Sequence, residues 1–165
     1  HYIVCNSSYG LKNDGGTDPA SYALGAFYRN SAVSFPDITD GSSSVILVGE
    51  RAYYVDGIKA FAGAMYAARD YNGTGPAISG DGSASNQGLI AIFGGGAALI
   101  NATPNSGQNR IAFSSEHPGG ANFGFADGSV RFLSETIEAN VATTAIDSTY
   151  EYLMGIRDAR VPGPY

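Results

Sequence analysis

Short apolar runs separated by turn-forming residues are the main pattern along this chain. Residues 2–5, "YIVC", and residues 44–50, "SVILVGE", are rich in β-branched side chains and have the length of strands. The second run ends at Glu50 and is expected to be a buried strand. Between such runs lie stretches rich in Gly, Ser, Asn and Asp, which are typical of turns and loops.

A hairpin is the most specific structural prediction. Residues 122–126, "NFGFA", and 129–133, "SVRFL", alternate apolar and other residues and are joined by Asp127-Gly128. An Asp-Gly pair in this setting predicts a two-residue type I′ turn, in which both central residues need a positive φ. Phe123 and Phe125 then share one face, and Val130 and Phe132 share a face of the partner strand.

Helical patterning is confined to the tail. Asp147 with Tyr150, Leu153 and Met154, and Ser134 with Ile137, resemble helix starts followed by apolar residues at i, i+3 spacing. We therefore predict a mainly β fold in a single domain, residues 1–165: an antiparallel sheet with long Gly/Ser-rich loops and a short C-terminal helix.

Composition agrees with this fold and limits the partners. Of 165 residues 23 are glycine, about twice the usual share, and only 15% are charged. The net charge of −6 provides no field that would attract phosphate, so nucleic acid and anionic membranes are not expected partners. The longest apolar stretch, residues 88–100, is too short to span a bilayer. A single cysteine, Cys5, excludes an internal disulfide and is expected to be a buried thiol.

His117 is the first candidate for chemistry, because it precedes "PGG" and therefore lies on a loop. It could be a ligand or a hydrogen-bonding residue paired with Asp127 across the hairpin. The structural alternative is a histidine that holds the glycine-rich loop. Asp127 is explained equally well as a turn residue, since Asp tolerates left-handed φ and bonds its own backbone.

Metal binding is only weakly indicated. A structural zinc site needs three or four His or Cys ligands, and the chain offers His1, His117 and Cys5. Loops with Asp37 and Asp40 in "DITDG", and Asp81 in "SGDGSASN", are weak calcium candidates that do not follow the EF-hand spacing. No cofactor other than calcium is suggested.

Catalysis is not predicted. No G-x-S-x-G and no G-x-G-x-x-G occur. Glu50 could in principle pair with Glu116 or Asp127, but their spacing supports neither pair. Adjacent Tyr53 and Tyr54, in "RAYYVDG", could stack on sugars or could simply pack in a strand.

Two blocks resemble a known bacterial family. His117, nine residues and then Asp127-Gly128 match the H-X9-DG pattern of prepilin-like proteins, within "SEHPGGANFGFADGSVRFLSETI", 115–137. The block "FYRNSAVSFPDITDGSSSVILVGER", 27–51, is similar to the family segment in which an "ITDG" turn precedes a strand ending in Gly-Glu-Arg. The intervening residues 52–110 match nothing comparable and are expected to be an insertion atypical of the family.

The resemblance implies a type IV pilin-like or type II secretion pseudopilin-like protein. Its members have a leader, a long apolar helix and a β-rich globular domain, so they are α+β at full length. This chain would be the globular head without that helix, and the membrane would be reached only through it. His117, Asp127, Gly128 and Glu50 would then be a structural signature.

The expected function is therefore a non-enzymatic structural subunit that forms or decorates an extracellular filament or a secretion pseudopilus. Its partners would be copies of itself or other pilin-like subunits, at the bacterial surface or outside the cell. The alternative is a secreted surface module that binds carbohydrate or protein. Three glycosylation sequons, at Asn6, Asn72 and Asn101, are about as many as chance supplies in so Ser- and Asn-rich a chain.

Overall fold

A computed structural model describes residues 1–11, 23–28, 31–60, 92–105, 107–160 and 162–165. The prediction that places a calcium ligand at Asp81 lies outside these residues, as do the sequon at Asn72 and the Gly/Ser-rich stretch 72–88.

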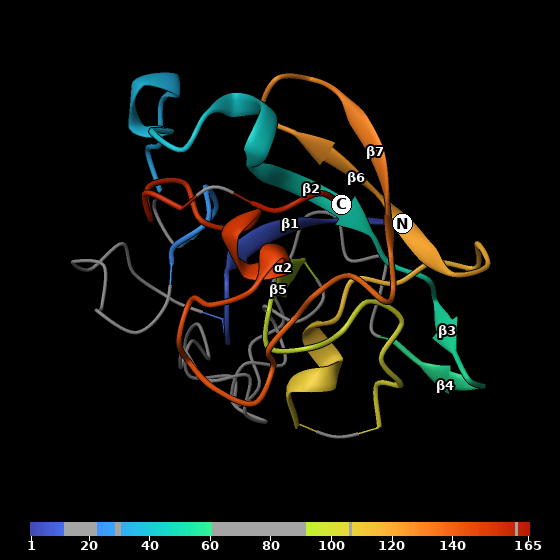
Figure 1. Ribbon diagram of the computed structural model, residues 1–165. Coiled ribbons are helices and arrows are strands. Elements are labelled where there is room, and N and C mark those ends of the chain that lie inside the picture. Colours follow the sequence, from blue (N-terminus) through green and yellow to red (C-terminus); the bar gives the residue numbers. More distant parts are fainter. Residues whose placement is uncertain (12–22, 29–30, 61–91, 106, 161) are drawn as a thin grey trace, which may run out of the picture.

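The fold is mainly β and is built on one five-stranded sheet (Figure 1). The strands follow the spatial order β5-β1-β2-β6-β7. Their bounds are β1 Tyr2–Ser7, β2 Ile46–Glu50, β5 Phe93–Gly95, β6 Gly120–Phe125 and β7 Val130–Ser134. The predicted strands at 2–5 and 44–50 and the predicted hairpin strands correspond to β1, β2, β6 and β7.

The sheet is mixed rather than purely antiparallel. Neighbours β1–β2, β2–β6 and β6–β7 are antiparallel, as expected. Strand β5, however, runs parallel to β1, with Val4 opposite Phe93 and Cys5 opposite Gly94. A parallel pair needs a long crossover, and the chain has about 85 residues between the two strands, so local pattern could not reveal the pairing. The prediction of an antiparallel sheet is wrong at this edge.

The remaining elements are short. A small hairpin pairs β3, Tyr54–Val55, with β4, Ile58–Lys59. Among the described residues, 3-10 helices span Phe35–Asp37, Ser42–Ser44 and Gly107–Ile111, and helix α2 covers Thr149–Tyr152. Within the described residues, no helix is long and apolar enough to cross a membrane.

Helix α2 and the residues that follow it cover one face of the sheet (Figure 1). Tyr150, Leu153 and Met154 belong to the same buried cluster as Ile3, Cys5 and Ile46. The Phe113 and Phe123 rings meet edge to face in this core, with centroids 5.0 Å apart. Burial raises the pKa of the Cys5 thiol to about 12, which agrees with the expected buried thiol.

The tail contains less helix than predicted. Ser134 does not start a helix: it is the last residue of β7, paired with Gly120, and a turn bond joins Ile137 N–H to its carbonyl. The second helix exists as α2, but its N-cap is Ser148, not Asp147, and Glu151 Oε2 accepts from the main-chain N–H groups of both residues. Pairing with β6 outweighs a local helix pattern at Ser134.

The turn at Asp127-Gly128 differs from the prediction. At Asp127-Gly128 only the glycine has a positive φ, +84°, and Gly128 N–H donates to Phe125 O while Phe125 N–H donates to Ser129 O. This is a three-residue loop typical of a type I turn followed by a G1 bulge, so the type I′ prediction is wrong here. The type I′ conformation occurs instead at Asp56-Gly57 in the β3–β4 hairpin, where φ is +50° and +75°.

The other face of the sheet is partly open over β2, β6 and β7. Val4, Val48, Gly124 and Val130 form one cross-strand row in the register. In the neighbouring positions Asn122 lies opposite Phe132, whose side chain is 49% exposed, and Val130 is 72% exposed. Phe123 and Phe125 point to the opposite, buried face, as the alternation predicted.

Candidate functional site at the His117 loop

The three residues of the Gly-Glu-Arg segment at the end of β2 make three different kinds of contact. A Cβ on Gly49 would lie 2.5 Å from Phe113 and 2.7 Å from Phe123, so only glycine fits under these rings. Arg51 is fully buried and donates from Nε to Ala112 O at 3.0 Å and from Nη2 to Phe93 O at 3.3 Å. Burial lowers the pKa of Arg51 to about 9.

Glu50 lies between β6 and the His117 loop. Its Oε2 accepts hydrogen bonds from the main-chain N–H of Asn122 at 2.7 Å and from Asn122 Nδ2 at 3.1 Å. Its other oxygen lies 3.7 Å from His117 Nε2. The Glu50 side chain is 16% exposed and that of His117 is 59% exposed, so the carboxylate is the buried member of the pair.

Ser115 shapes the loop that carries His117. Its hydroxyl accepts from His117 N–H and donates to Gly120 O, both at 2.9 Å. Ser115 N–H in turn donates to Asn101 Oδ1 at 2.9 Å, and Asn101 Nδ2 donates to Glu135 Oε2 at 2.7 Å. The loop is therefore tied to two distant segments of the chain, to Asn101 directly and to Glu135 through Asn101.

His117 and Asp127 lie at opposite ends of β6, so the hypothesis that they pair across the hairpin is wrong. Strand β6 has six residues, so its two ends lie about 20 Å apart. Asp127 instead accepts from Ser129 N–H at 2.8 Å and lies 3.5 Å from Arg131. The hydrogen bond with Ser129 lowers the pKa of Asp127. The nine-residue spacing between His117 and Asp127 therefore corresponds to one strand, β6, with a turn at each end.

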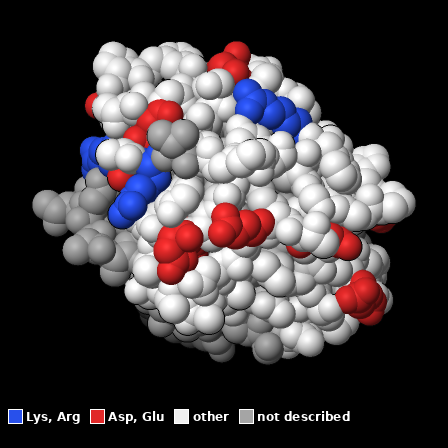
Figure 2. All heavy atoms as spheres, in the orientation of Figure 1, with Lys and Arg blue, Asp and Glu red and all other residues white. Residues whose placement is uncertain are grey.

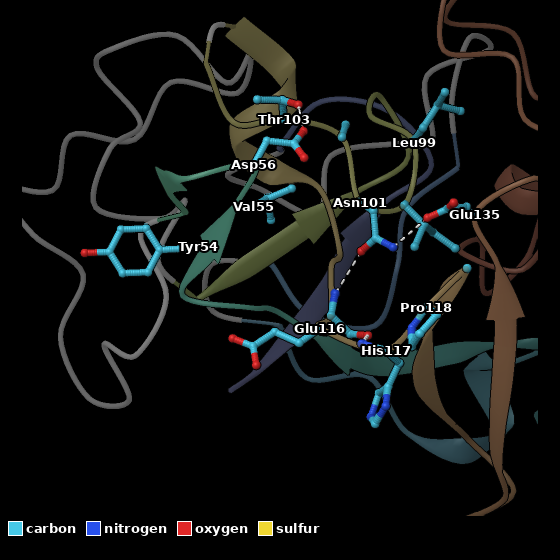
Figure 3. Close-up of a pocket in the computed structure, with 14 residues that line it drawn as sticks. Tyr54, Val55, Asp56, Leu99, Asn101, Thr103, Glu116, His117, Pro118 and Glu135 are labelled. Carbon is cyan, nitrogen blue, oxygen red and sulfur yellow. Dashed lines mark hydrogen bonds between the residues drawn. The ribbon is translucent and has the colours of Figure 1, made fainter.

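A cleft of about 660 Å³ opens beside the His117 loop (Figure 3). Its walls come from the β3–β4 hairpin, residues 99–103, the loop 115–119 and Glu135. Figure 3 shows Tyr54 and Glu116 at one side, Leu99 and Glu135 at the other, and Asn101 between them. In the part of the chain that the structure describes, the lining includes Asp56, Glu116 and Glu135 and no Lys or Arg.

The two tyrosines face different surroundings. Tyr54 lines this cleft and is 54% exposed. Tyr53 lines a second cleft of about 390 Å³ together with His1, Glu50 and Arg51, and the Lys59 ammonium lies 4.9 Å from its ring centroid. The rings touch edge to face, with centroids 4.9 Å apart. Packing within the hairpin therefore covers part of the Tyr53 ring but leaves much of Tyr54 exposed.

Comparison with known proteins gives a family without an assigned activity. Residues 2–140 match the family SBP_bac_10, described as a protein of unknown function (DUF1559). The chain belongs to this family. No curated protein and no solved structure shows significant similarity to it. The DUF1559 match includes both blocks on which the prepilin-like resemblance rests.

The DUF1559 chain also uses its "ITDG" segment structurally. Asp40 accepts hydrogen bonds from Asp158 N–H at 2.7 Å and from Ala159 N–H at 2.9 Å, while Thr39 N–H donates to Ile156 O at 2.8 Å. Gly41 follows with φ +92°. This turn therefore anchors the C-terminal segment to the rest of the domain.

The calcium candidates have other partners in the structure. Asp37 Oδ2 accepts from Ser34 N–H and Ser34 Oγ, and both Asp40 oxygens accept from the C-terminal segment. Within the described residues, no group of three or more His, Cys, Asp or Glu side chains is placed to hold a metal ion.

Several site residues were not singled out from the sequence. Asn101, Ser115 and Asn122 act through hydrogen bonds with residues distant in the chain, and nothing in their local sequence indicates this. For Arg51 the sequence contained one indication of a role, its place in the Gly-Glu-Arg block. Asn101, although part of a sequon, uses its side-chain amide within the protein and has a left-handed φ of +61°.

His117→Ala should lower the free energy of unfolding by less than about 1 kcal/mol, because the ring is exposed and its contact with Glu50 is a surface pair. Glu50→Ala should have a larger effect, about 2 kcal/mol, because it leaves Asn122 without its charged acceptor. Urea unfolding of both variants measures the difference. A larger loss for His117→Ala than for Glu50→Ala would contradict this assignment.

Asp158→Asn should weaken the pH dependence of stability. Burial and the nearby Asp40 raise the pKa of Asp158 from 3.8 to about 6, so the folded state binds this proton more tightly than the unfolded chain. Stability therefore falls as pH rises from about 4 to about 6 and stays lower above that range. Because the group is half exposed, the variant should gain on the order of 1 kcal/mol at pH 7.5 and little at pH 4.

Urea unfolding at the two pH values tests this expectation, with Asp37→Asn as the control. A hydrogen bond from Ser34 lowers the pKa of Asp37, so its loss should not stabilise the protein at pH 7.5. Equal effects of Asp158→Asn at both pH values would contradict the raised pKa.

Proposed function

We propose that this chain is the globular head of a pilin-like or pseudopilin-like structural subunit, and that it is not an enzyme. The observation that carries the proposal is the open apolar part of the sheet. Val130 and Phe132 lie side by side on the edge strand β7, next to Val48 and Gly124, and both are exposed. A contiguous exposed apolar surface indicates a surface covered in the assembled protein.

We further propose that this sheet face packs against the apolar helix that the prepilin-like resemblance implies, or against a neighbouring subunit. Strand β7 is the edge of the sheet in the part of the chain that the structure describes, and an edge strand offers backbone groups for pairing with another chain. On the side that carries α2, most of the visible surface belongs to uncharged residues, with acidic and basic side chains in small separate patches (Figure 2). Low surface charge supports close packing of subunits outside the cell.

The contacts of His117 also favour a structural role over hydrolysis. Its ring contacts Glu50, whereas the hydroxyl of Ser115, on the same loop, is engaged with main-chain groups. A serine nucleophile would instead need its hydroxyl within hydrogen-bond reach of the imidazole.

The gene upstream of His1 provides the first test. A prepilin leader followed by an apolar helix of about 20 residues would support the proposal. An ordinary signal peptide would favour a free secreted module.

Assembly in the native host tests the sheet face directly. In the full-length protein, Val130→Asp with Phe132→Asp should remove the subunit from sheared surface filaments, detected by immunoblot and electron microscopy. Both side chains are exposed, so the domain should still fold. Phe35→Asp is the control, because Phe35 is 71% exposed but belongs to the 3-10 helix Phe35–Asp37 and not to the sheet. Normal incorporation of the double variant would refute the proposed packing surface.

A second candidate is a surface-binding module for carbohydrate or protein. The exposure of Tyr53 and Tyr54 on the β3–β4 hairpin favours it, because an exposed aromatic ring offers a stacking surface and its hydroxyl a hydrogen bond. Loss of binding in Tyr53→Ala or Tyr54→Ala, with the fold intact, would support this function.

A further inference from the structure

The cleft between the β3–β4 hairpin and the His117 loop has the properties of a preformed ligand site. Its volume of about 660 Å³ falls within the range of small-molecule sites. Four segments from distant parts of the sequence form its walls, and side-chain hydrogen bonds join them. Asn101 bonds both Ser115 and Glu135, and Thr103 bonds Asp56.

The walls are fixed by the fold and not by a ligand. Glu135 N–H donates to Gly119 O at 2.9 Å, so the loop that carries His117 and the end of β7 are joined. Asn109 Nδ2 donates to Thr103 O at 3.1 Å, which holds the opposite wall. A ligand that enters such a cleft does not have to order these segments, and this lowers the entropic penalty of binding.

The lining combines apolar surface with hydrogen-bond acceptors. Tyr54 and Leu99 are both large, exposed side chains at opposite sides of the cleft (Figure 3). Between and beside them lie the carboxylates of Asp56, Glu116 and Glu135. Carboxylates accept strong hydrogen bonds from hydroxyl groups, and an aromatic ring packs against the C–H face of a sugar.

This chemistry excludes anionic ligands and favours a polyol over a cation. Among the described residues, three carboxylates and no Lys or Arg line the cleft, so phosphate, sulfate and uronic acids would be repelled. A lysine or arginine side chain would be attracted, but exposed ion pairs contribute about 0–1 kcal/mol each in an open, solvated cleft. A neutral sugar uses the aromatic surface and the acceptors together.

We propose that this cleft binds a neutral saccharide, with Tyr54 as the stacking platform and Asp56, Glu116 and Glu135 as acceptors for its hydroxyl groups. Figure 3 shows the Tyr54 ring extending outward from the side where Glu116 lies, which fits a chain that continues beyond the cleft. The inference rests on the second proposed function, the surface-binding module, and specifies its ligand class and its site. It assigns binding to Tyr54 and not to Tyr53, which lines the other cleft.

Affinity electrophoresis of the protein tests the inference. The gels contain neutral polysaccharides (galactomannan, xyloglucan or a β-glucan) or anionic ones (polygalacturonate or alginate). At least one neutral polymer should retard the protein, and the anionic ones should not. Tyr54→Ala should weaken the retardation at least tenfold and Glu116→Gln about threefold.

Two aromatic variants serve as matched controls. Tyr53→Ala and Phe132→Ala each remove a half-exposed ring outside this cleft and should change the affinity less than twofold. Thermal unfolding of each variant establishes that the fold is retained.

Three results would overturn the inference: no retardation by any neutral polymer, wild-type retardation of Tyr54→Ala, or binding of a tetralysine peptide in place of the neutral polymers. Loss of binding in Tyr53→Ala alone would support the binding-module function but contradict its assignment to this cleft. Filament assembly is tested separately through Val130 and Phe132, so failure here leaves the structural-subunit proposal intact.

Discussion

Arg51→Met should lower the free energy of unfolding by about 3 kcal/mol, the largest effect expected of a single substitution in this chain. The guanidinium is fully buried and donates to the main-chain carbonyls of Ala112 and Phe93. Methionine fills similar space but has no donor, so two buried carbonyls lose a partner, at about 1–3 kcal/mol each, partly offset by apolar burial. For a chain of this size, the midpoint of thermal unfolding should fall by roughly 6–12 °C.

Arg131→Met is the matched control for this substitution. Arg131 is an arginine as well, but its side chain is 34% exposed, and its partner is the Asp127 carboxylate in a surface pair. We expect a change below about 1 kcal/mol. If denaturant unfolding gives the two variants similar stabilities, the hydrogen bonds of Arg51 do not hold residues 93 and 112 against the end of β2.

Gly49→Ala should destabilise the protein by about 2 kcal/mol, although it adds only one methyl group. The new Cβ would lie within 2.7 Å of Phe113 and Phe123, two fully buried rings that pack against each other. Neither ring can move without displacing other core residues, and overpacking of this kind typically costs about 1–3 kcal/mol.

Gly124→Ala is the matched control, because it places the same methyl group in the adjacent strand but on the open face of the sheet. There, among the described residues, the added Cβ would meet a methyl group of Val48 at 2.8 Å, and Val48 is partly exposed and can adjust. Denaturant unfolding should show a clearly smaller loss for Gly124→Ala. Equal losses would mean that strand propensity, and not the fit under the two phenylalanines, explains the glycine at position 49.

These contacts give a physical explanation for the two blocks that carry the family resemblance. Gly49 accommodates two rings, Glu50 holds β6 and the His117 loop, and Arg51 bonds two distant carbonyls. Asp40 anchors the C-terminal segment, and Gly128 closes the β6–β7 turn. Each block therefore has a structural explanation, consistent with the proposed role as a structural subunit.

The local pattern determined the strands and one hairpin. Strands β1, β2, β6 and β7 follow from β-branched runs and alternation, because side chains on a strand alternate between a buried and an exposed face. The presence of a turn at Asp127-Gly128 could also be predicted from the local sequence. Its type was not: the hydrogen bonds of Phe125 with Gly128 and Ser129 select a three-residue loop, and the type I′ turn appears at Asp56-Gly57.

Only the tertiary structure decided which distant residues meet. Strand β5 joins β1 in parallel, and His117 meets Glu50 and not Asp127, because strand order is set by packing across the whole domain. The cleft arises in the same way, since Tyr54, Asn101, Ser115 and Glu135 come together from four separate segments. The sequence by itself determined which segments form strands and turns. Long-range pairing and burial decided the sheet order, the core position of Arg51 and the cleft, because these features depend on contacts between residues far apart in the chain.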